Sequence, residues 1–451
     1  MSLRRIPGTS RQYHLISYDK NGHERPDADG SSASEAALAD LRDPAAGVTD
    51  VFILSHGWQG DYDGAIDQYD RWLGAADPDA AGDGIRPFVI GVHWPSRAWS
   101  DRELKSAPSG LLGGEEDPGE ADGMSIDEAV DEYATLLPDR PGVREALRTV
   151  LEHASEIDPD EDATARATLP AEVARAYRVL SAATGDAGGD DPLLGGGWDP
   201  VEVFAEASAE QADDGLLGEG WFHKLREAVL TPLRQLTFWH CKNQAREFGE
   251  RGAAQLVRAI MRATAPDVRV HLMGHSFGTI VVSGAVRGPG GTPAPPPRPV
   301  SSLFLVQGAV SLWAFADPAP RRIGGGRGYF ADVTRPEFVS GPIVVTRSSW
   351  DYAVGRFYPL AVSISQEYLL GDDLPKFGGI GTFGIQTPGA VELPVLTRGS
   401  TSADTPFAVG GRYNIDASAV IRTLAGASGA HSDLAHAELV WLGWRAALAG
   451  R

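Results

Sequence analysis

Residues 268–286 read VRVHLMGHSFGTIVVSGAV, and this stretch decides the fold. The segment VRVHLM predicts a buried strand, and the segment TIVVSGAV that follows predicts a helix. Between them, Gly274-His275-Ser276-Phe277-Gly278 fits the pattern G-x-S-x-G. In a sharp turn from strand to helix the serine takes strained backbone angles, and the flanking glycines let neighbouring backbone come close. The stretch therefore predicts a nucleophilic serine, Ser276, at the end of a strand.

Six short apolar runs, each followed by a turn signal and then a helical pattern, predict the α/β class. In this class a mainly parallel sheet carries helices on both faces. The runs are residues 51–54, 88–92, 268–273, 303–307, 343–346 and, less regular than the others, 413–421. Residues 12–18, QYHLISY, predict an edge strand or a hairpin that precedes the parallel set.

The length of 451 residues exceeds that of one average domain. We expect an α/β core over residues 1–100 and 235–451, interrupted by an acidic, mostly helical insertion over residues 101–234. Capping and proline signals in the insertion predict three helices, from Ser125 to about 137, from Pro141 to about 157 and from Pro170 to about 183. Residues 185–200 have the composition of a glycine-rich linker.

The formal net charge of −21 is concentrated in one segment. Residues 101–220 hold 30 acidic and 8 basic side chains, whereas the rest of the chain holds 31 acidic and 32 basic ones. A field of this sign repels phosphate, so nucleic acid and anionic membranes are not expected as partners of this segment. Its charge fits either a solvated surface or the steering of cationic or neutral substrates.

The composition, with 42% hydrophobic and 22% charged residues, is typical of a soluble globular protein. The single cysteine, Cys241, excludes intramolecular disulfides and thiolate-rich metal sites, and we expect it to be buried by packing. The N-terminus lacks the apolar run of a signal peptide, and the longest apolar stretch, residues 303–316, is too short to span a bilayer. We therefore expect a cytoplasmic protein without an integral membrane segment. The sequence does not predict its oligomeric state.

Metal and nucleotide chemistry have little support in the sequence. Residues 27–30 and 61–64 lack the further ligands of a calcium loop and are expected to be turns. No glycine-rich phosphate loop occurs between a predicted strand and a helix. No metal or organic cofactor is therefore expected.

The GHSFG stretch, His56-Gly57-Trp58 after the first core strand and Trp94-Pro95-Ser96 after the second resemble the α/β-hydrolase superfamily. Within it, the chain is most similar to bacterial serine hydrolases with HGW and WPS loops. The resemblance covers roughly residues 48–100 and 236–445 and does not extend over the acidic insertion. It implies an α/β-hydrolase fold in which the insertion forms a cap or lid.

A serine hydroxyl becomes a strong nucleophile when an imidazole takes its proton and a carboxylate holds that imidazole. In the fold that the resemblance implies, the chain order is serine, acid, histidine. Only His431 and His436 follow Ser276 in the chain. We expect His431 to be the base because it lies in a loop, whereas His436 is expected inside the last predicted helix.

Asp351 is the expected acid because it follows the run 343–346 at the carboxyl end of that strand. Asp317, which comes one strand earlier, and then Asp332 are the alternatives. Each of these aspartates could instead cap a helix or a turn. The sequence thus predicts a catalytic triad of Ser276, His431 and Asp351.

The tetrahedral intermediate of acyl transfer needs N–H donors for its oxyanion. The backbone N–H of Phe277, directly after the nucleophile, is one expected donor, and by resemblance that of Trp58 is the other. Aromatic side chains follow several predicted strands and are expected to line an apolar substrate pocket, unless they only pack the loops. The side chains expected at the pocket are Trp94, Trp99, Trp313, Trp350 and Tyr352.

These features favour a serine hydrolase of carboxylic esters, esterase-like or lipase-like, that acts through an acyl-enzyme. Its substrate would be a small-molecule ester with an apolar moiety. An amidase or peptidase, a thioesterase and an acyltransferase would use the same side chains. A non-catalytic binding protein that keeps the fold is the alternative from a different class.

Overall fold

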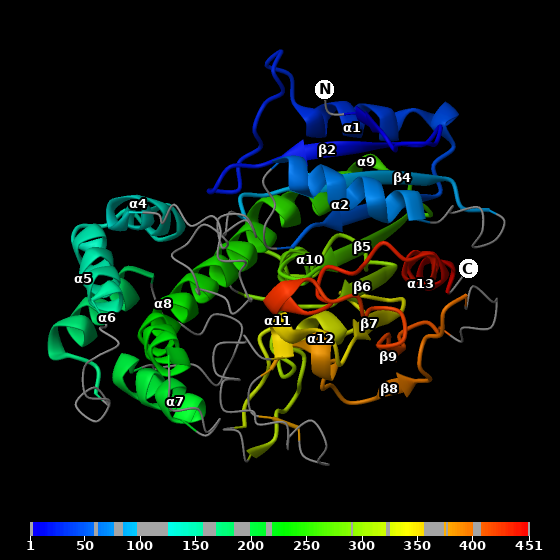
Figure 1. The fold of residues 1–451 in the computed structure, drawn as a ribbon. Coiled ribbons are helices and arrows are strands. Elements are labelled where there is room, and N and C mark those ends of the chain that lie inside the picture. The colour runs from blue at the N-terminus through cyan, green and yellow to red at the C-terminus, as the bar shows by residue number, and fades with distance from the viewer. Residues whose placement is uncertain are drawn as a thin grey trace.

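The structure is a computed structural model that describes residues 3–57, 62–75, 84–96, 125–156, 168–184, 199–212, 219–289, 292–321, 325–355, 374–375, 378–399 and 407–449. Within these ranges nine strands form one sheet, in the order β1-β2-β4-β3-β5-β6-β7-β9-β8 (Figure 1). Their bounds are β1 Leu3–Arg5, β2 Gln12–Ser17, β3 Asp50–Ser55, β4 Pro87–His93, β5 Arg269–His275, β6 Ser302–Val306, β7 Ile343–Arg347, β8 Ala390–Leu393 and β9 Arg412–Asp416.

The sheet is mostly parallel, which confirms the predicted α/β class. Only β1 and β2 pair antiparallel, and the other seven neighbouring pairs are parallel. Five of the predicted runs coincide with β3, β4, β5, β6 and β7, whereas the sixth, 413–421, is a strand only as far as Asp416, where β9 ends. Because parallel strands end at the same edge, the residues that follow β5, β6 and β7 come together at one side of the sheet.

The predicted hairpin at the N-terminus is present, but the edge-strand alternative for residues 12–18 is wrong. Strand β2 pairs antiparallel with β1 on one side and parallel with β4 on the other. The edge is therefore β1, a strand of three residues that is too short to give a clear apolar pattern.

Helices cover both faces of the sheet, as the alternation of buried side chains shows. In β3, Val51 and Ile53 belong to one apolar cluster, whereas Phe52 and Leu54 belong to the other. The first cluster includes side chains of α1 (Ala33–Arg42), α9 (Ala254–Ala263) and α10 (Gly278–Arg287). The second includes side chains of α2 (Tyr62–Ala75) and α13 (Ala437–Leu448), which lie on the near side of the sheet in Figure 1.

The acidic segment contains helices that extend to one side of the sheet (Figure 1). Those expected after Ser125, Pro141 and Pro170 are α4 (Ile126–Leu136), α5 (Val143–Ser155) and α6 (Ala171–Thr184). The hydroxyl of Ser125 accepts from the backbone N–H of Glu128, whose carboxylate accepts from the backbone of Ser125, a reciprocal cap that fixes where α4 begins.

Two further helices connect this segment to the sheet. The first, α7 (Pro200–Ala212), lacks a predicted counterpart, and the expected linker over 185–200 lies outside the described residues except for its last two. The second, α8 (Glu219–Phe248), leads through a π-helical turn, Gly249–Ala253, into α9. Cys241 on α8 is buried, as expected.

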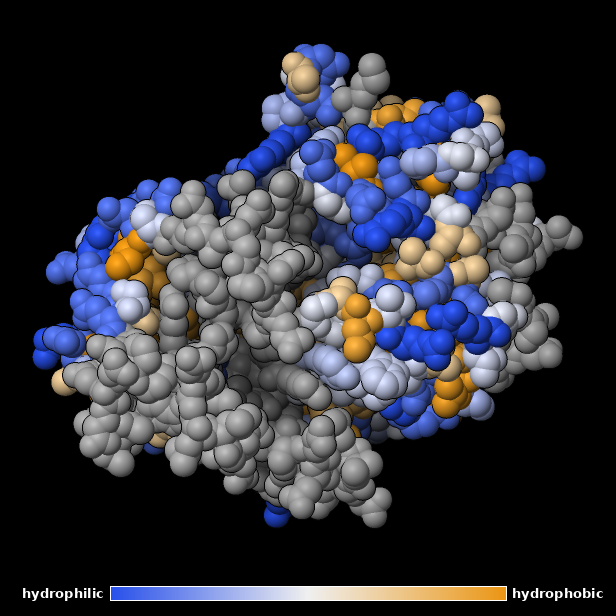
Figure 2. All heavy atoms as spheres, viewed as in Figure 1, coloured by the Kyte–Doolittle hydropathy of each residue, from blue (hydrophilic) through white to orange (hydrophobic). Residues whose placement is uncertain are grey.

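The described surface carries hydrophobic residues only in small groups on the face shown in Figure 2. The exposed large apolar side chains include Leu3, Val179 and Val391, which come from separate elements. Single exposed apolar residues of this kind are ordinary for a globular protein. Across the residues that the structure describes, every helix is too short or too polar to cross a bilayer.

Candidate active site

Ser276 occupies a sharp turn between β5, the central strand of the sheet, and α10. Its φ of 54° lies in the left-handed region, which a residue with a Cβ rarely adopts. A Cβ atom at Gly274 would lie 2.2 Å from the carbonyl oxygen of Gly278, and one at Gly278 would lie 2.3 Å from that of Ser55. Both flanking positions therefore require glycine, and together they let the strand, the turn and β3 pack closely around Ser276.

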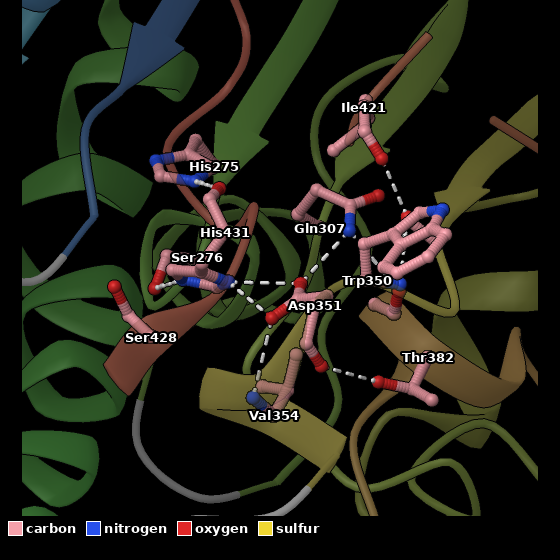
Figure 3. A network of polar contacts seen from close by, with 12 residues as sticks. His275, Ser276, Gln307, Trp350, Asp351, Val354, Thr382, Ile421, Ser428 and His431 are labelled. Atoms are coloured by element: carbon pink, nitrogen blue, oxygen red, sulfur yellow. Dashed lines mark hydrogen bonds and ion pairs between the residues drawn. The ribbon is translucent and has the colours of Figure 1, made fainter. Parts of the chain in front are cut away.

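The side chains of Ser276, His431 and Asp351 form one hydrogen-bonded chain (Figure 3). The Oγ atom of Ser276 lies 2.8 Å from Nε2 of His431, and Nδ1 of His431 lies 2.9 Å from both carboxylate oxygens of Asp351. Since a carboxylate accepts, Nδ1 carries the proton, and Nε2 is left to accept from the serine hydroxyl. This tautomer is the one that can take the serine proton.

The chain of three is largely enclosed by protein. Ser276 is 3% exposed and Asp351 1%, while the side chain of His431 is 12% exposed. Such surroundings strengthen the hydrogen bonds between the three groups, because little water competes for them.

The two aspartates considered as alternatives to Asp351 contact arginines instead of His431. Asp317 pairs with Arg327, and Asp332 pairs with Arg327 and Arg335. Each thus has a structural partner among the arginines of its own loop region.

The alternative histidine also has another partner. Nε2 of His436 donates to Oδ1 of Asp433 at 2.8 Å, because a carboxylate only accepts. The expectation that it lies inside the last helix is wrong: α13 begins at Ala437, and His436 is its N-cap residue in an extended conformation. The residues before Ala437 turn through a short loop, so the periodic apolar pattern alone placed the start too early.

His275, the residue before Ser276, holds the backbone of His431. Its Nε2 lies 3.1 Å from the carbonyl oxygen of His431, and its Nδ1 lies 2.9 Å from the side-chain amide nitrogen of Gln68 on α2. Because a carbonyl only accepts, Nε2 donates and Nδ1 accepts from Gln68. Burial, and after it the nearby imidazole of His431, lowers the pKa of His275 well below its ordinary value of 6.5.

The loop after β3 comes close to Ser276. A Cβ atom at Gly57 would lie 2.5 Å from Cβ of Ser276, so only glycine allows this approach. His56 is neutral, since burial and the neighbouring His93 lower its pKa to about 3. Its Nδ1 bonds to the carbonyl of Gly57 at 2.8 Å, and Tyr69 on α2 accepts from its backbone N–H at 2.8 Å. His56 and Tyr69 therefore brace the loop.

Of the two expected oxyanion donors, one is described. Phe277 is the N-cap residue of α10, so its backbone N–H lies at the amino end of that helix, where backbone donors and the helix dipole favour negative charge. Its ring is fully buried against Phe238. Trp58 lies outside the described residues.

The aromatic residues expected at a pocket divide into three groups. Trp94 is 1% exposed and stacks between His56 and Phe248, and Trp313 is 3% exposed and donates to the carbonyl of Pro375 at 3.2 Å, so both pack the interior. Trp350, which is 41% exposed, and Tyr352 flank Asp351. Trp99 lies outside the described residues.

A second Ser-His-Asp arrangement lies at the opposite edge of the sheet. Oγ of Ser302 is 2.8 Å from Nδ1 of His271, whose Nε2 is 3.0 Å from Asp50. All three are within strands and at most 3% exposed. Distances alone thus do not identify a catalytic group. Ser276 differs in its left-handed turn, the close approach of Gly57 and the helix that begins beside it.

Among the described residues, no three His, Cys, Asp or Glu side chains are arranged to hold a metal ion. Comparison of the chain with family models, with curated proteins and with solved structures gives no match. We therefore infer the function from the geometry of the site.

Proposed function

We propose that this protein is a serine hydrolase of carboxylic esters with an α/β-hydrolase fold. The observation that carries the proposal is the chain from Ser276 through His431 to Asp351, with hydrogen bonds of 2.8 and 2.9 Å, built on a strained turn at the carboxyl edge of the sheet. A serine hydroxyl that stands on a strained turn and donates to an imidazole nitrogen is suited to attack a carbonyl carbon.

In the proposed first step, Oγ of Ser276 attacks the ester carbonyl while its proton passes to Nε2 of His431. Asp351 holds the imidazole in place and stabilises the positive charge that the ring acquires. The backbone N–H of Phe277, at the start of α10, supports the oxyanion. His431 then gives the proton to the alcohol, which leaves an acyl group on Ser276.

In the second step His431 takes a proton from water, and the resulting hydroxide attacks the acyl carbon. The tetrahedral intermediate collapses as the proton returns from His431 to Oγ, which releases the carboxylic acid and restores Ser276. An amidase, a thioesterase or an acyltransferase differs from this sequence only in the leaving group or the acceptor.

The test is hydrolysis of 4-nitrophenyl esters from acetyl to palmitoyl. We expect turnover that Ser276→Ala abolishes, whereas the matched variant Ser302→Ala, in the other Ser-His-Asp arrangement, keeps it. The dependence of activity on the length of the acyl chain tests for an acyl pocket and for the cap that we assign to the acidic segment. Equal activity of Ser276→Ala and wild type, or activity lost only in Ser302→Ala, would contradict the proposal.

A further inference from the structure

Gln307, which directly follows β6, shares an unusual backbone conformation with the nucleophile. In the described part of the chain, Ser276 at φ 54° and Gln307 at φ 44° are the non-glycine residues with positive φ. Such a conformation is strained and persists where the surroundings determine it, often at functional sites. Gln307 is also fully buried. Its position lies between the strand that carries Ser276 and the strand that precedes Asp351.

The side-chain amide of Gln307 has one orientation that satisfies its neighbours. Its nitrogen donates to Oδ2 of Asp351 at 2.8 Å and to the carbonyl of Gly381 at 3.2 Å. Its oxygen accepts from the hydroxyl of Thr346 at 3.1 Å, and that hydroxyl in turn accepts from the backbone N–H of Gln307 at 3.2 Å. A flipped amide would set its oxygen against two acceptors, so Thr346 and Gly381 fix which end faces Asp351.

The carboxylate of Asp351 is held from three sides. Gln307 reaches Oδ2 from the end of β6, the backbone N–H of Val354 reaches Oδ1 at 3.3 Å from α11 (Tyr352–Gly355), and Nδ1 of His431 bridges both oxygens (Figure 3). Without the amide, rotation of the carboxylate about its Cβ–Cγ bond would be limited by Val354 and His431 alone.

We propose that Gln307 is a positioning residue that fixes the plane of the Asp351 carboxylate and, through it, the imidazole of His431. This inference rests on the proposed function. It assigns to Gln307 no contact with substrate, and it explains why a buried, strained position holds a long amide side chain.

The chemistry of the site requires an amide at position 307. Glutamate would place a second carboxylate beside Asp351 and an acceptor beside the carbonyl of Gly381, and two like charges at that distance cannot both ionise readily. Methionine, of similar length, would leave Oδ2 of Asp351 and the hydroxyl of Thr346 without this partner.

The first arm of the test compares kcat/KM on an ester substrate for Gln307→Met, Thr346→Val and a matched control. We expect Gln307→Met to lose about 10- to 100-fold, mainly in kcat, because a small displacement of a catalytic group has an effect of this size. Thr346→Val removes the hydroxyl that holds the amide of Gln307 but keeps the amide itself, so its loss of kcat/KM should be smaller. The control is Asn414→Leu: Asn414 is also a buried amide, 2% exposed, but bonds to Ile385 and Glu392.

The second arm does not require turnover. Proton–nitrogen NMR of protein labelled in histidine follows the Nδ1–H of His431, assigned by its loss in His431→Gln. We expect that signal to shift or broaden in Gln307→Met and in Thr346→Val, and to stay in place in Asn414→Leu. An unchanged signal together with kcat/KM within about twofold of wild type overturns the role of Gln307. If wild type hydrolyses no ester, the proposed function fails, while the NMR comparison still decides whether Gln307 positions His431.

Discussion

The backbone N–H of Ala430 donates to the carbonyl of Trp350 at 2.8 Å, which ties the residue before His431 to the residue before Asp351. An isolated bridge between Asp351 and Gly429 joins the same two loops. His431 and Asp351 are therefore held together through their main chains as well as their side chains. This contact lies outside the sheet, and its geometry depends on the residue at position 429.

Gly429→Ala should separate these two loops. Gly429 has a φ of 65°, and a Cβ atom there would lie 2.3 Å from the carbonyl oxygen of Trp350 and 2.8 Å from the ring of Tyr352. We expect a loss of activity of about 10-fold or more in a folded protein. Gly426→Ala is the control, since Gly426 has a φ of 58° but no atom within 4 Å of such a Cβ. Equal activities of the two variants would show that the contact does not position the triad.

Gly57→Ala should disturb the nucleophile directly. The added methyl group would meet Cβ of Ser276 at 2.5 Å, so either the serine or the loop after β3 must move. We expect kcat/KM to fall by about 10- to 100-fold. At Gly74 on α2 the nearest atom to an added Cβ is 3.9 Å away, so Gly74→Ala should keep activity and stabilise the helix by about 0.5 to 1 kcal/mol. If Gly57→Ala keeps wild-type kinetics, the loop after β3 does not position Ser276.

His275 should make folding sensitive to acid. Its pKa in the folded protein is lowered well below 6.5, first by burial, so the unfolded chain takes up a proton below pH 6.5 and the folded chain does not. Stability contributed by the neutral ring is complete above that pH and declines as pH falls, by up to about 1.4 kcal/mol per pH unit. Between pH 6.5 and 5, the free energy of unfolding of His275→Gln should therefore fall less steeply than that of wild type. Denaturant melts at several pH values measure both slopes, and identical slopes would contradict the assignment.

Asp50, at the amino end of β3, should stabilise the fold rather than serve the reaction. Burial alone would raise its pKa, but hydrogen bonds from His271 and Thr49 outweigh it and hold the pKa at about 2, below the ordinary 3.8. The stability that Asp50 contributes is present above pH 3.8 and is lost as pH falls towards 2.

Asp50→Asn should accordingly lower the free energy of unfolding by about 2 to 3 kcal/mol at neutral pH, because it removes the charge that pairs with Arg269 and accepts from His271. The difference from wild type should shrink between pH 4 and 2, and kcat/KM of the folded fraction should stay unchanged. Denaturant melts and ester kinetics on the same samples check both statements. A specific loss of kcat without loss of stability would assign Asp50 to the reaction instead.

The fold was predictable where sequence pattern and burial coincide. The parallel strands lie inside the sheet and read as continuous apolar runs, so β3 and β5 to β7 follow from the sequence. The two edge strands, β1 and β8, have three and four residues and mostly exposed or half-buried side chains, which leaves no such signal. The amphipathic pattern of α7 is similarly weak, since its sequence is rich in alanine and glutamate.

Within the site, only the three side chains of the proposed triad could be selected from the sequence. The spacing of GHSFG and the order of Ser276, Asp351 and His431 sufficed to select the three side chains that the structure brings together. Gln307 and Gly429 were not found, because glutamine has no preference for positive φ and one glycine among 54 carries no signal by itself. Their roles arise from contacts between loops distant in sequence, which no local pattern encodes.

The most direct test of the account is reaction with a fluorophosphonate probe, followed by mass spectrometry of the modified peptide. We expect a single adduct on Ser276, whose Oγ lies 2.8 Å from Nε2 of His431, with labelling abolished in Ser276→Ala and slowed strongly in His431→Ala. Ser302→Ala should label like wild type. Absence of an adduct on folded wild-type protein, or an adduct that persists in Ser276→Ala, would contradict the assignment of Ser276 as the nucleophile.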